Sequence, residues 1–247
     1  MATFVLVHAG FHGAWCWIKL RPLLEAAGHQ VYTPTLTGLG ERAPLARPDV
    51  GLSTHVQDVR GLLQEHDLRD VVLVGHSYAG MVITGVAGAA PERLAHLMYL
   101  DALVPRDGEA VADVVPPEVW RYRRAARRQG DGWRVPPPRA LPSGLGGLFG
   151  VTTEPDLSWV RARLTAQPLK TFEEPLRLAQ PAAPAALPRT YIECAGAGPL
   201  VALVRRVVQP RLRPPAEPGW RQRRLPTGHD AMITMPHALA RLLLELG

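Results

Sequence analysis

The sequence predicts an α/β fold in which helices cover both faces of a mostly parallel six-stranded sheet and a cap is inserted between two of the strands. Short apolar runs alternate with longer helix-type runs, which is the pattern of a parallel sheet covered by helices. Residues 71–74 are apolar at every position, as expected for a strand that is buried on both faces. A chain of 247 residues is long enough for one large domain of this kind.

The same alternation assigns each element in chain order. Gly28 is a typical C-terminal glycine for the first helix, Pro34 closes the second strand, and Ser53 is a suitable N-cap for the second helix. Strands are predicted at 4–8, 30–34, 71–74, 96–100, 189–194 and 220–225. Helices are predicted at 15–27, 53–65, 81–90, 200–208 and 236–246.

Residues 104–187 break this alternation. They contain proline runs, a glycine-rich stretch at 143–147, and helix-type runs at 119–128 and 157–164. Because the strands on either side of this segment need each other to complete one sheet, we interpret it as an inserted cap and not as a linker. The predicted organisation is a core of residues 1–103 and 188–247 with a cap of residues 104–187, in one domain overall.

The chain is basic, with a formal net charge of +6, and Lys19 and Lys170 are its only lysines. The arginines within 121–128 and 221–224 could bind phosphate or could form an ordinary solvated surface. Because no nucleic-acid-binding motif accompanies them, we expect no nucleic-acid partner.

Other features of the sequence limit its compartment and its chemistry. No apolar run reaches the roughly 20 residues that span a bilayer. The N-terminus lacks the positive region and the cleavage site of a signal peptide. Two cysteines, Cys16 and Cys194, make neither a disulfide framework nor a zinc site. We therefore expect a cytoplasmic protein with no membrane partner and no metal.

The segment Gly75-His76-Ser77-Tyr78-Ala79 carries the strongest chemical signal. It follows the apolar strand at 71–74 and precedes a predicted helix, which is the context of a nucleophile elbow. Small residues two positions before and after the serine let the strand and the helix approach each other closely. Ser77 is therefore the candidate nucleophile, and the alternative is an ordinary buried serine at a helix cap.

A serine nucleophile needs an adjacent base and N–H donors for the oxyanion that forms on attack. His229 follows the last predicted strand, which places it at the same sheet edge as Ser77, although it could also be a surface-loop histidine. The backbone N–H of Tyr78 is one expected oxyanion donor. The second is expected from the glycine-rich turn after the first strand, at Gly10 or Phe11.

With these motifs, the chain resembles the α/β-hydrolase superfamily, and within it the branch of hydroxynitrile lyases, plant methyl-salicylate-type esterases and related bacterial hydrolases. The matching segments are FVLVHAGFHGAWCW at 4–17, LLEAAGH at 23–29, TLTGLGER at 35–42, GHSYAG at 75–80 and Gly228-His229. The resemblance implies an α/β-hydrolase fold with a lid, Ser77 as nucleophile, His229 as base and no cofactor. It also implies oxyanion donors at Tyr78 and at Gly10, because the family's first donor lies two residues after the strand-end histidine.

The chain departs from this branch at the acid of the catalytic triad. The branch carries that acid a few residues beyond Cys194, where this chain reads Ala-Gly-Ala-Gly-Pro and has no carboxylate. Asp101, at the end of the fourth predicted strand, is the expected substitute, because some superfamily members carry the acid there and the chain order of the triad is kept. Asp101 could instead cap a turn. Glu193, within a strand, and Asp230, adjacent to His229, are weaker alternatives.

These residues predict a serine hydrolase that cleaves a carboxylic ester, thioester or lactone of a small, mostly apolar substrate through an acyl-enzyme. Two alternatives stay open. One is a lyase or biosynthetic tailoring enzyme that uses the same serine and histidine as acid–base groups. Hydroxynitrile lyases use a lysine near this histidine, and both lysines of this chain are far from His229 in sequence, which weakens the case for cyanohydrin cleavage. The other is a non-catalytic small-molecule binder, which the absence of an acid near Ala197 favours.

The predicted cap is rich in aromatic side chains. They can contact an apolar substrate or can form the core of the cap itself. The residues are Trp120, Trp133, Phe149, Trp159 and Phe172. The sequence is also compatible with a homodimer.

Overall fold

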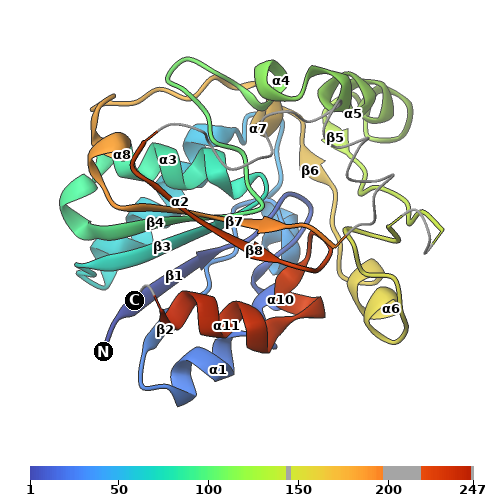
Figure 1. Cartoon of the computed structure of the whole chain (residues 1–247). Helices are drawn as coiled ribbons and strands as arrows, with labels where there is room; N and C mark the ends of the chain where they lie inside the picture. The colour runs from blue at the N-terminus through green and yellow to red at the C-terminus, as the bar shows by residue number, and fades with distance from the viewer. Residues whose placement is uncertain (143–145, 197–217, 246–247) are drawn as a thin grey trace.

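A computed structural model of the protein describes residues 1–142, 146–196 and 218–245. Its main sheet has six parallel strands in the order β2-β1-β3-β4-β7-β8. The strands span Thr3–Val7 (β1), Gln30–Tyr32 (β2), Val71–His76 (β3), Leu94–Leu100 (β4), Arg189–Cys194 (β7) and Trp220–Leu225 (β8). All six predicted strands are present, and the predicted α/β fold with a parallel sheet is confirmed (Figure 1).

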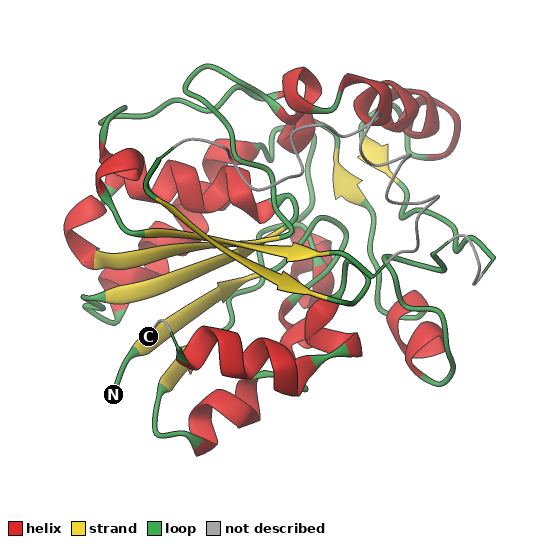
Figure 2. Cartoon of the chain, in the orientation of Figure 1, coloured by secondary structure: helices red, strands yellow, loops and turns green. Residues whose placement is uncertain are grey.

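Helices cover both faces of this sheet (Figure 2). Because side chains along a strand point alternately to opposite faces, Val5 and Val7 of β1 join the hydrophobic cluster of α2 and α3, whereas Phe4 and Leu6 join that of α1 and α11. The four helices span Arg21–Ala26 (α1), Leu52–Glu65 (α2), Ala79–Ala89 (α3) and Pro236–Leu244 (α11). A short helix, α10 (Ala231–Thr234), precedes α11.

Two of the predicted helices differ in the structure. The continuous helix predicted at 15–27 is wrong: a 3-10 turn at Ala14–Trp17 is followed by α1, which begins at Arg21. The reason is Pro22, which fits only the first turn of a helix because it lacks an N–H and clashes with the preceding turn. The N-cap of α2 is Gly51 and not Ser53, whose hydroxyl donates to Glu174 instead. The predicted helix at 200–208 lies outside the described residues.

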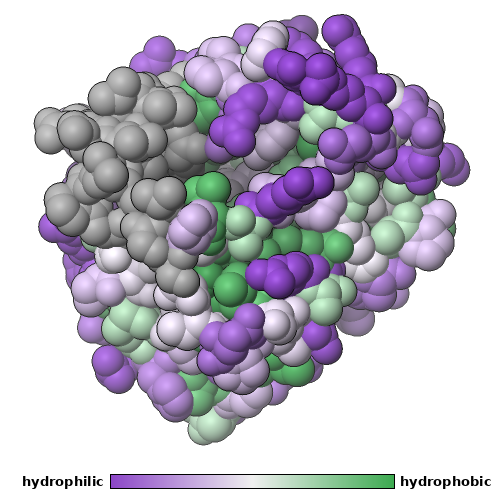
Figure 3. All heavy atoms as spheres, turned by 90° about the vertical axis from the view of Figure 1, so that its right-hand side faces the viewer, coloured by the Kyte–Doolittle hydropathy of each residue, from purple (hydrophilic) through white to green (hydrophobic). Residues whose placement is uncertain are grey.

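Residues 104–187, here called the inserted segment, carry several short elements. The helices are α4 (Val111–Val114), α5 (Pro116–Gln129), α6 (Asp156–Arg161), α7 (Lys170–Glu173) and α8 (Ala183–Ala186), and β5 (Arg134–Val135) pairs antiparallel with β6 (Gln167–Pro168). The helices predicted at 119–128 and 157–164 correspond to α5 and α6. Most of the segment lies beyond the carboxyl ends of the sheet strands (Figure 1). Seen from that side, apolar surface occupies the middle of the molecule between hydrophilic side chains (Figure 3).

The described residues also bear on cysteine chemistry and membrane insertion. Cys16 and Cys194 are both buried and form no disulfide. Within the part of the chain that the structure describes, no helix combines the length and the apolar character needed to cross a membrane.

Gly80, in the first turn of α3, lets the chain that follows β4 approach this helix. A Cβ built at Gly80 would overlap the carbonyl oxygen of Leu103. The N–H of Leu103 in turn donates to the carbonyl of Ser77 at 3.0 Å. The absence of a side chain at Gly80 therefore permits the contact between the turn after β3 and the segment after β4.

We expect Gly80→Ala to destabilise the fold, because the added methyl group forces the Leu103 backbone away from α3, and overpacking of this kind costs about 1–3 kcal/mol. Gly61→Ala is the matched control, since Gly61 lies within α2 and a Cβ there meets nothing within 4 Å. That change should stabilise the protein by up to about 1 kcal/mol through helix propensity. Urea unfolding measures both values, and equal stability of the two variants would contradict this role of Gly80.

Candidate active site

Ser77 occupies a sharp turn between β3 and α3. Its φ angle is +56°, in the left-handed region that residues other than glycine seldom adopt. Backbone hydrogen bonds hold the turn: Ser77 N–H donates to Leu100 O at 3.1 Å, and Ser77 O accepts from Leu103 N–H at 3.0 Å and from Gly80 N–H at 3.1 Å. This strained strand–turn–helix geometry is that of a nucleophile elbow.

Small residues on both sides of the serine make this turn possible. A Cβ at Gly75 would lie 2.8 Å from Ala79 O and 2.9 Å from Ile83 Cγ2, so the position where β3 meets α3 requires glycine. Ala79 is fully buried at the start of α3, and the structure accommodates its methyl group in place of a second glycine.

His229 and Asp101 are brought together by the ends of two strands. Asp101 directly follows β4 and is fully buried, and its Oδ2 lies 2.6 Å from Nδ1 of His229, which is 19% exposed on the loop after β8. The Oδ1 of Asp101 accepts a hydrogen bond from Cys194 N–H at 3.4 Å. An ionised carboxylate only accepts hydrogen bonds, so this contact keeps the proton of His229 on Nδ1 and leaves Nε2 able to accept one.

The other two carboxylates considered for this role point elsewhere. Glu193 lies in β7 and its Oε2 is 3.5 Å from Nε of Arg224 on the neighbouring strand β8. Asp230 is fully buried, and its Oδ2 lies 3.1 Å from Nε2 of His12, not beside the ring of His229. Of the three carboxylates, Asp101 is the one that the structure places against Nδ1 of His229.

Phe149 and His76 connect the loop of His229 with the turn of Ser77. The ring of Phe149 lines the same pocket as Ser77, and its centroid is 6.2 Å from that of His229. His76, the residue before Ser77, donates from Nε2 to the carbonyl of His229 at 3.0 Å. The hydroxyl, the imidazole and the carboxylate are therefore carried by three adjoining turns at the carboxyl edge of the sheet.

Gly10 and Phe11 follow β1 and line the pocket beside Ser77. Phe11 has a φ of +66°, and its N–H donates to Oε1 of Gln167 at 2.8 Å. A Cβ at Gly10 would lie 2.8 Å from the same oxygen. Of the two expected oxyanion donors on this loop, the N–H of Phe11 is thus hydrogen-bonded to Gln167. The side chain of Gln167 also packs closely against Gly10, where a Cβ would collide with it.

Gln167 comes from β6 of the inserted segment and is fully buried. Its Nε2 donates to Oγ1 of Thr171 at 2.8 Å, which orients the amide so that Oε1 faces Phe11. A second link joins the same segments, since Thr165 N–H donates to Phe11 O at 3.0 Å. The inserted segment therefore binds both backbone polar groups of Phe11.

Tyr78, the other expected oxyanion donor, is fixed through its side chain. Its hydroxyl lies 2.9 Å from Nδ1 of His55. Because Nε2 of His55 is 2.9 Å from the carbonyl of Thr37, which can only accept, the hydrogen of this ring is on Nε2 and the Tyr78 hydroxyl donates to Nδ1. Burial raises the pKa of Tyr78 well above its usual value and lowers the pKa of His55, so both side chains stay neutral.

The pocket at Ser77 is small, about 60 Å³, and aromatic. The rings of Phe11, Tyr122 and Phe172 form one cluster, with centroids 4.8–5.8 Å apart. Burial raises the pKa of the Tyr122 hydroxyl far above its usual value, so this wall carries no charge. The remaining lining residues are Gly10, Tyr78, Leu103, Val111, Val115, Glu118 and Phe149.

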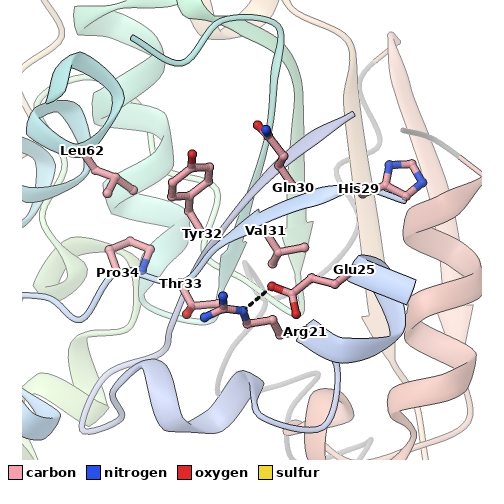
Figure 4. Close-up of a pocket in the computed structure, with 9 residues that line it drawn as sticks. All are labelled: Arg21, Glu25, His29, Gln30, Val31, Tyr32, Thr33, Pro34 and Leu62. Carbon is pink, nitrogen blue, oxygen red and sulfur yellow. Dashed lines mark hydrogen bonds and ion pairs between the residues drawn. The ribbon is translucent and has the colours of Figure 1, made fainter. Parts of the chain in front are cut away.

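A larger groove, of about 580 Å³, lies against the edge strand β2, away from Ser77. Arg21 and Glu25 of α1 point toward each other in it and form an ion pair at 2.7 Å, while Gln30 and Tyr32 come from β2 (Figure 4). The lining contains no serine or cysteine that could act as a nucleophile. Size alone therefore does not identify the site in this molecule.

The described residues contain no group of three His, Cys, Asp or Glu side chains arranged to hold a metal ion. Sequence reasoning missed Gln167, which bonds Phe11 N–H, and His55, which bonds the Tyr78 hydroxyl. Gln167 is 156 residues from Phe11, and no local pattern links the two positions.

Comparisons with known proteins identify the family of the chain. Residues 4–242 match the family described as the alpha/beta hydrolase family. Over 256 aligned residues, covering 100% of both proteins, the chain is 40% identical to the carbendazim hydrolyzing esterase of Nocardioides sp. (strain SG-4G). It is also 36% identical to methylesterase 1 of Arabidopsis thaliana over 104 residues. This alignment covers 41% of this chain and 40% of that protein.

Among solved structures, an extracellular alpha/beta-hydrolase from a Paenibacillus species has a TM-score of 0.81 at 24% identity, over 100% of this chain and 99% of that one. At this level of identity, the likeness shows the fold. The sequence matches over nearly the whole chain show the family as well as the fold. The chain belongs to the alpha/beta hydrolase family, in its methylesterase-like branch, and is an enzyme of the carboxylesterase type.

Proposed function

We propose that this enzyme is a serine hydrolase that cleaves a carboxylic ester of a small, mostly apolar substrate through an acyl-enzyme. The observation that carries the proposal is the 2.6 Å contact between His229 Nδ1 and the buried carboxylate of Asp101, at the sheet edge that also carries Ser77. This contact supplies what the loop after Cys194 lacks, an acid that orients the base. Thioesters and lactones present the same carbonyl chemistry to the same groups.

In the proposed mechanism, Ser77 Oγ attacks the ester carbonyl while His229 Nε2 takes the hydroxyl proton. Asp101 holds the Nδ1 proton and stabilises the imidazolium. The N–H groups of Gly10 and Tyr78 bind the oxyanion. The intermediate collapses, and His229 returns its proton to the departing alcohol. Water, activated by His229, then attacks the acyl-enzyme and releases the carboxylic acid and the free serine.

The aromatic wall of the pocket supports a substrate with a flat, apolar group next to the carbonyl. Phe11, Tyr122 and Phe172 present ring faces and edges that pack on such a group. The full-length relative named as a carbendazim hydrolyzing esterase supports the same class, because carbendazim is a methyl carbamate of a planar aromatic amine. We infer that methyl esters and methyl carbamates of planar aromatic compounds are suitable substrates.

We also propose that residues 104–187 form a cap on a core made of residues 1–103 and 188–247, within one domain. The support is that the hydrophobic clusters on both faces of the sheet include residues of the inserted segment, such as Val119 on one side and Val160 on the other. The hydrogen bonds from Gln167 and Thr165 to Phe11 join the two parts directly beside Ser77.

The first test is hydrolysis of p-nitrophenyl acetate, methyl benzoate and carbendazim by the wild type, Ser77→Ala and His229→Ala. Removal of a triad serine or histidine costs about 10⁴- to 10⁶-fold in kcat, so product release by both variants should fall to background. A fluorophosphonate probe should label the wild type at Ser77 and neither variant. Equal hydrolysis by wild type and Ser77→Ala would refute the proposal, and cyanide release from mandelonitrile in place of ester hydrolysis would favour a lyase.

The second test concerns the acid. Asp101→Asn should lower kcat by about 10⁴-fold, the size of effect that the same change has in a chymotrypsin-type triad, because an amide N–H favours the wrong tautomer of the base. Glu193→Gln is the matched control, since this carboxylate pairs with Arg224 on the neighbouring strand and should leave kcat unchanged. Loss of activity in Glu193→Gln with retention in Asp101→Asn would reverse the assignment.

The third test concerns the loop that carries Gly10. Gln167→Leu removes the acceptor of Phe11 N–H, so the loop loses its fixed conformation and kcat should fall by about 10-fold or more, while KM changes little. Gln180→Leu is the control, because it makes the same chemical change at an exposed position of the inserted segment. Steady-state kinetics with p-nitrophenyl acetate give kcat and KM separately, and equal constants for both variants would show that Gln167 has no part in catalysis.

A further inference from the structure

Three buried ionisable side chains lie behind the proposed catalytic residues and have no role in the mechanism above. They are His12, His76 and Asp230, and each is fully buried. His12 follows the loop of Gly10, His76 precedes Ser77, and Asp230 follows His229. Each of the three is therefore within two residues of a group that the mechanism uses.

His12 joins the Gly10 loop to Asp230. Its Nδ1 lies 2.7 Å from the carbonyl oxygen of Gly10, and its Nε2 lies 3.1 Å from Oδ2 of Asp230. A carbonyl oxygen only accepts hydrogen bonds, so Nδ1 carries a hydrogen. The contact between Nε2 and Oδ2 contains one further proton, as imidazolium and carboxylate or as imidazole and carboxylic acid. In both forms, His12 holds the Gly10 carbonyl and is itself held by Asp230.

His76 performs the corresponding task for the base. Its Nε2 lies 3.0 Å from the carbonyl oxygen of His229, so the hydrogen of this ring is on Nε2. Burial is the main reason that the pKa of His76 lies well below its usual value, which keeps the ring neutral. The Oδ1 of Asp230 lies 3.9 Å from the same Nε2, so the carboxyl group of Asp230 sits between the two histidines.

The backbone of Asp230 is fixed as firmly as its side chain. Its N–H donates to the carbonyl of Phe149 at 2.8 Å, and its own carbonyl accepts from Ile233 and Thr234 in the first turn of α10. The ring of His12 stacks on Trp15, with centroids 5.1 Å apart and planes 20° apart. Asp230 therefore links the start of α10 to His12 by a hydrogen bond, and its Oδ1 lies 3.9 Å from Nε2 of His76.

Within the part of the chain that the structure describes, this arrangement leaves two buried polar atoms without a hydrogen-bond partner. Among the described residues, Oδ1 of Asp230 and Nδ1 of His76 are buried without a hydrogen-bond partner. Buried polar groups that lack partners destabilise a fold, and replacement of a buried ion pair by apolar side chains is often neutral or stabilising. Stability alone does not account for these residues, whereas the two backbone carbonyls that they hold belong to the proposed site.

We propose that Asp230, with His12 and His76, is a positioning residue for the proposed ester hydrolysis. It holds His12 by a hydrogen bond and its carboxyl group packs beside His76, and these two histidines contact the carbonyls of Gly10 and His229, which fixes the spacing between the proposed oxyanion loop and the proposed base. The inference rests on the proposed function. A displacement of about 1 Å between such groups can cost about 100-fold in rate, which gives the size of the expected effect.

The test compares Asp230→Ala with Asp230→Asn. The amide of Asn can donate to Nε2 of a neutral His12 and keeps the connection, whereas Ala leaves Nε2 without a partner. We expect Asp230→Ala to lower kcat by about 100-fold with KM within about 3-fold, and Asp230→Asn to stay within about 5-fold of the wild type. Steady-state kinetics with p-nitrophenyl acetate measure both constants, and thermal unfolding measures the stability of each variant.

A second pair tests the other end of the network and serves if Asp230→Ala does not fold. His76→Gln keeps an N–H near the position of Nε2 and should retain the kcat of the wild type. His76→Leu removes the donor to the His229 carbonyl and should lower kcat. Equal loss in Ala and Asn at position 230, equal loss in both variants at position 76, or a raised KM with unchanged kcat would overturn the inference. If a fluorophosphonate labels the wild type at Ser77, the proposed function stands even where these variants contradict the positioning role of Asp230.

Discussion

The buried contact between Asp101 and His229 fixes the carboxyl edge of the sheet. A carboxylate removed from water is tolerated only when it has partners. The partners of Asp101 include Nδ1 of His229, after β8, and the N–H of Cys194, at the end of β7. One side chain after β4 therefore connects three neighbouring strand ends. The turn of Ser77 joins the same edge, because its N–H donates to Leu100, the last residue of β4.

The inserted segment also holds the loops at this edge of the sheet by hydrogen bonds. Through Gln167 and Thr165 it binds the N–H and the carbonyl of Phe11, and through the carbonyl of Phe149 it binds the N–H of Asp230. The loop of Gly10 and Phe11 and the loop of His229 and Asp230 are thus both hydrogen-bonded to residues 104–187. The same segment also lines the pocket at Ser77, so pocket shape and the positions of the two loops depend on one part of the chain.

Most of the sheet could be predicted because its signals are local and periodic. Strands buried on both faces give apolar runs such as 71–74, and all six predicted strands are in the structure. The errors fall at helix starts. Pro22 restarts a helix that looks continuous by hydrophobic pattern, and Gly51 caps α2 where Ser53 looks more suitable, because Ser53 instead contacts Glu174 of the inserted segment.

The sequence by itself determined the candidates Ser77, His229 and Asp101, because each follows a recognisable strand and the carboxyl ends of parallel strands share one edge. Only the tertiary structure decided that Asp101, and not Glu193 or Asp230, faces His229. It also decided that Gln167 and His12 hold the loop of Gly10. These contacts join residues far apart in the chain, and a hydrogen bond between two such side chains depends on packing that no local periodicity records.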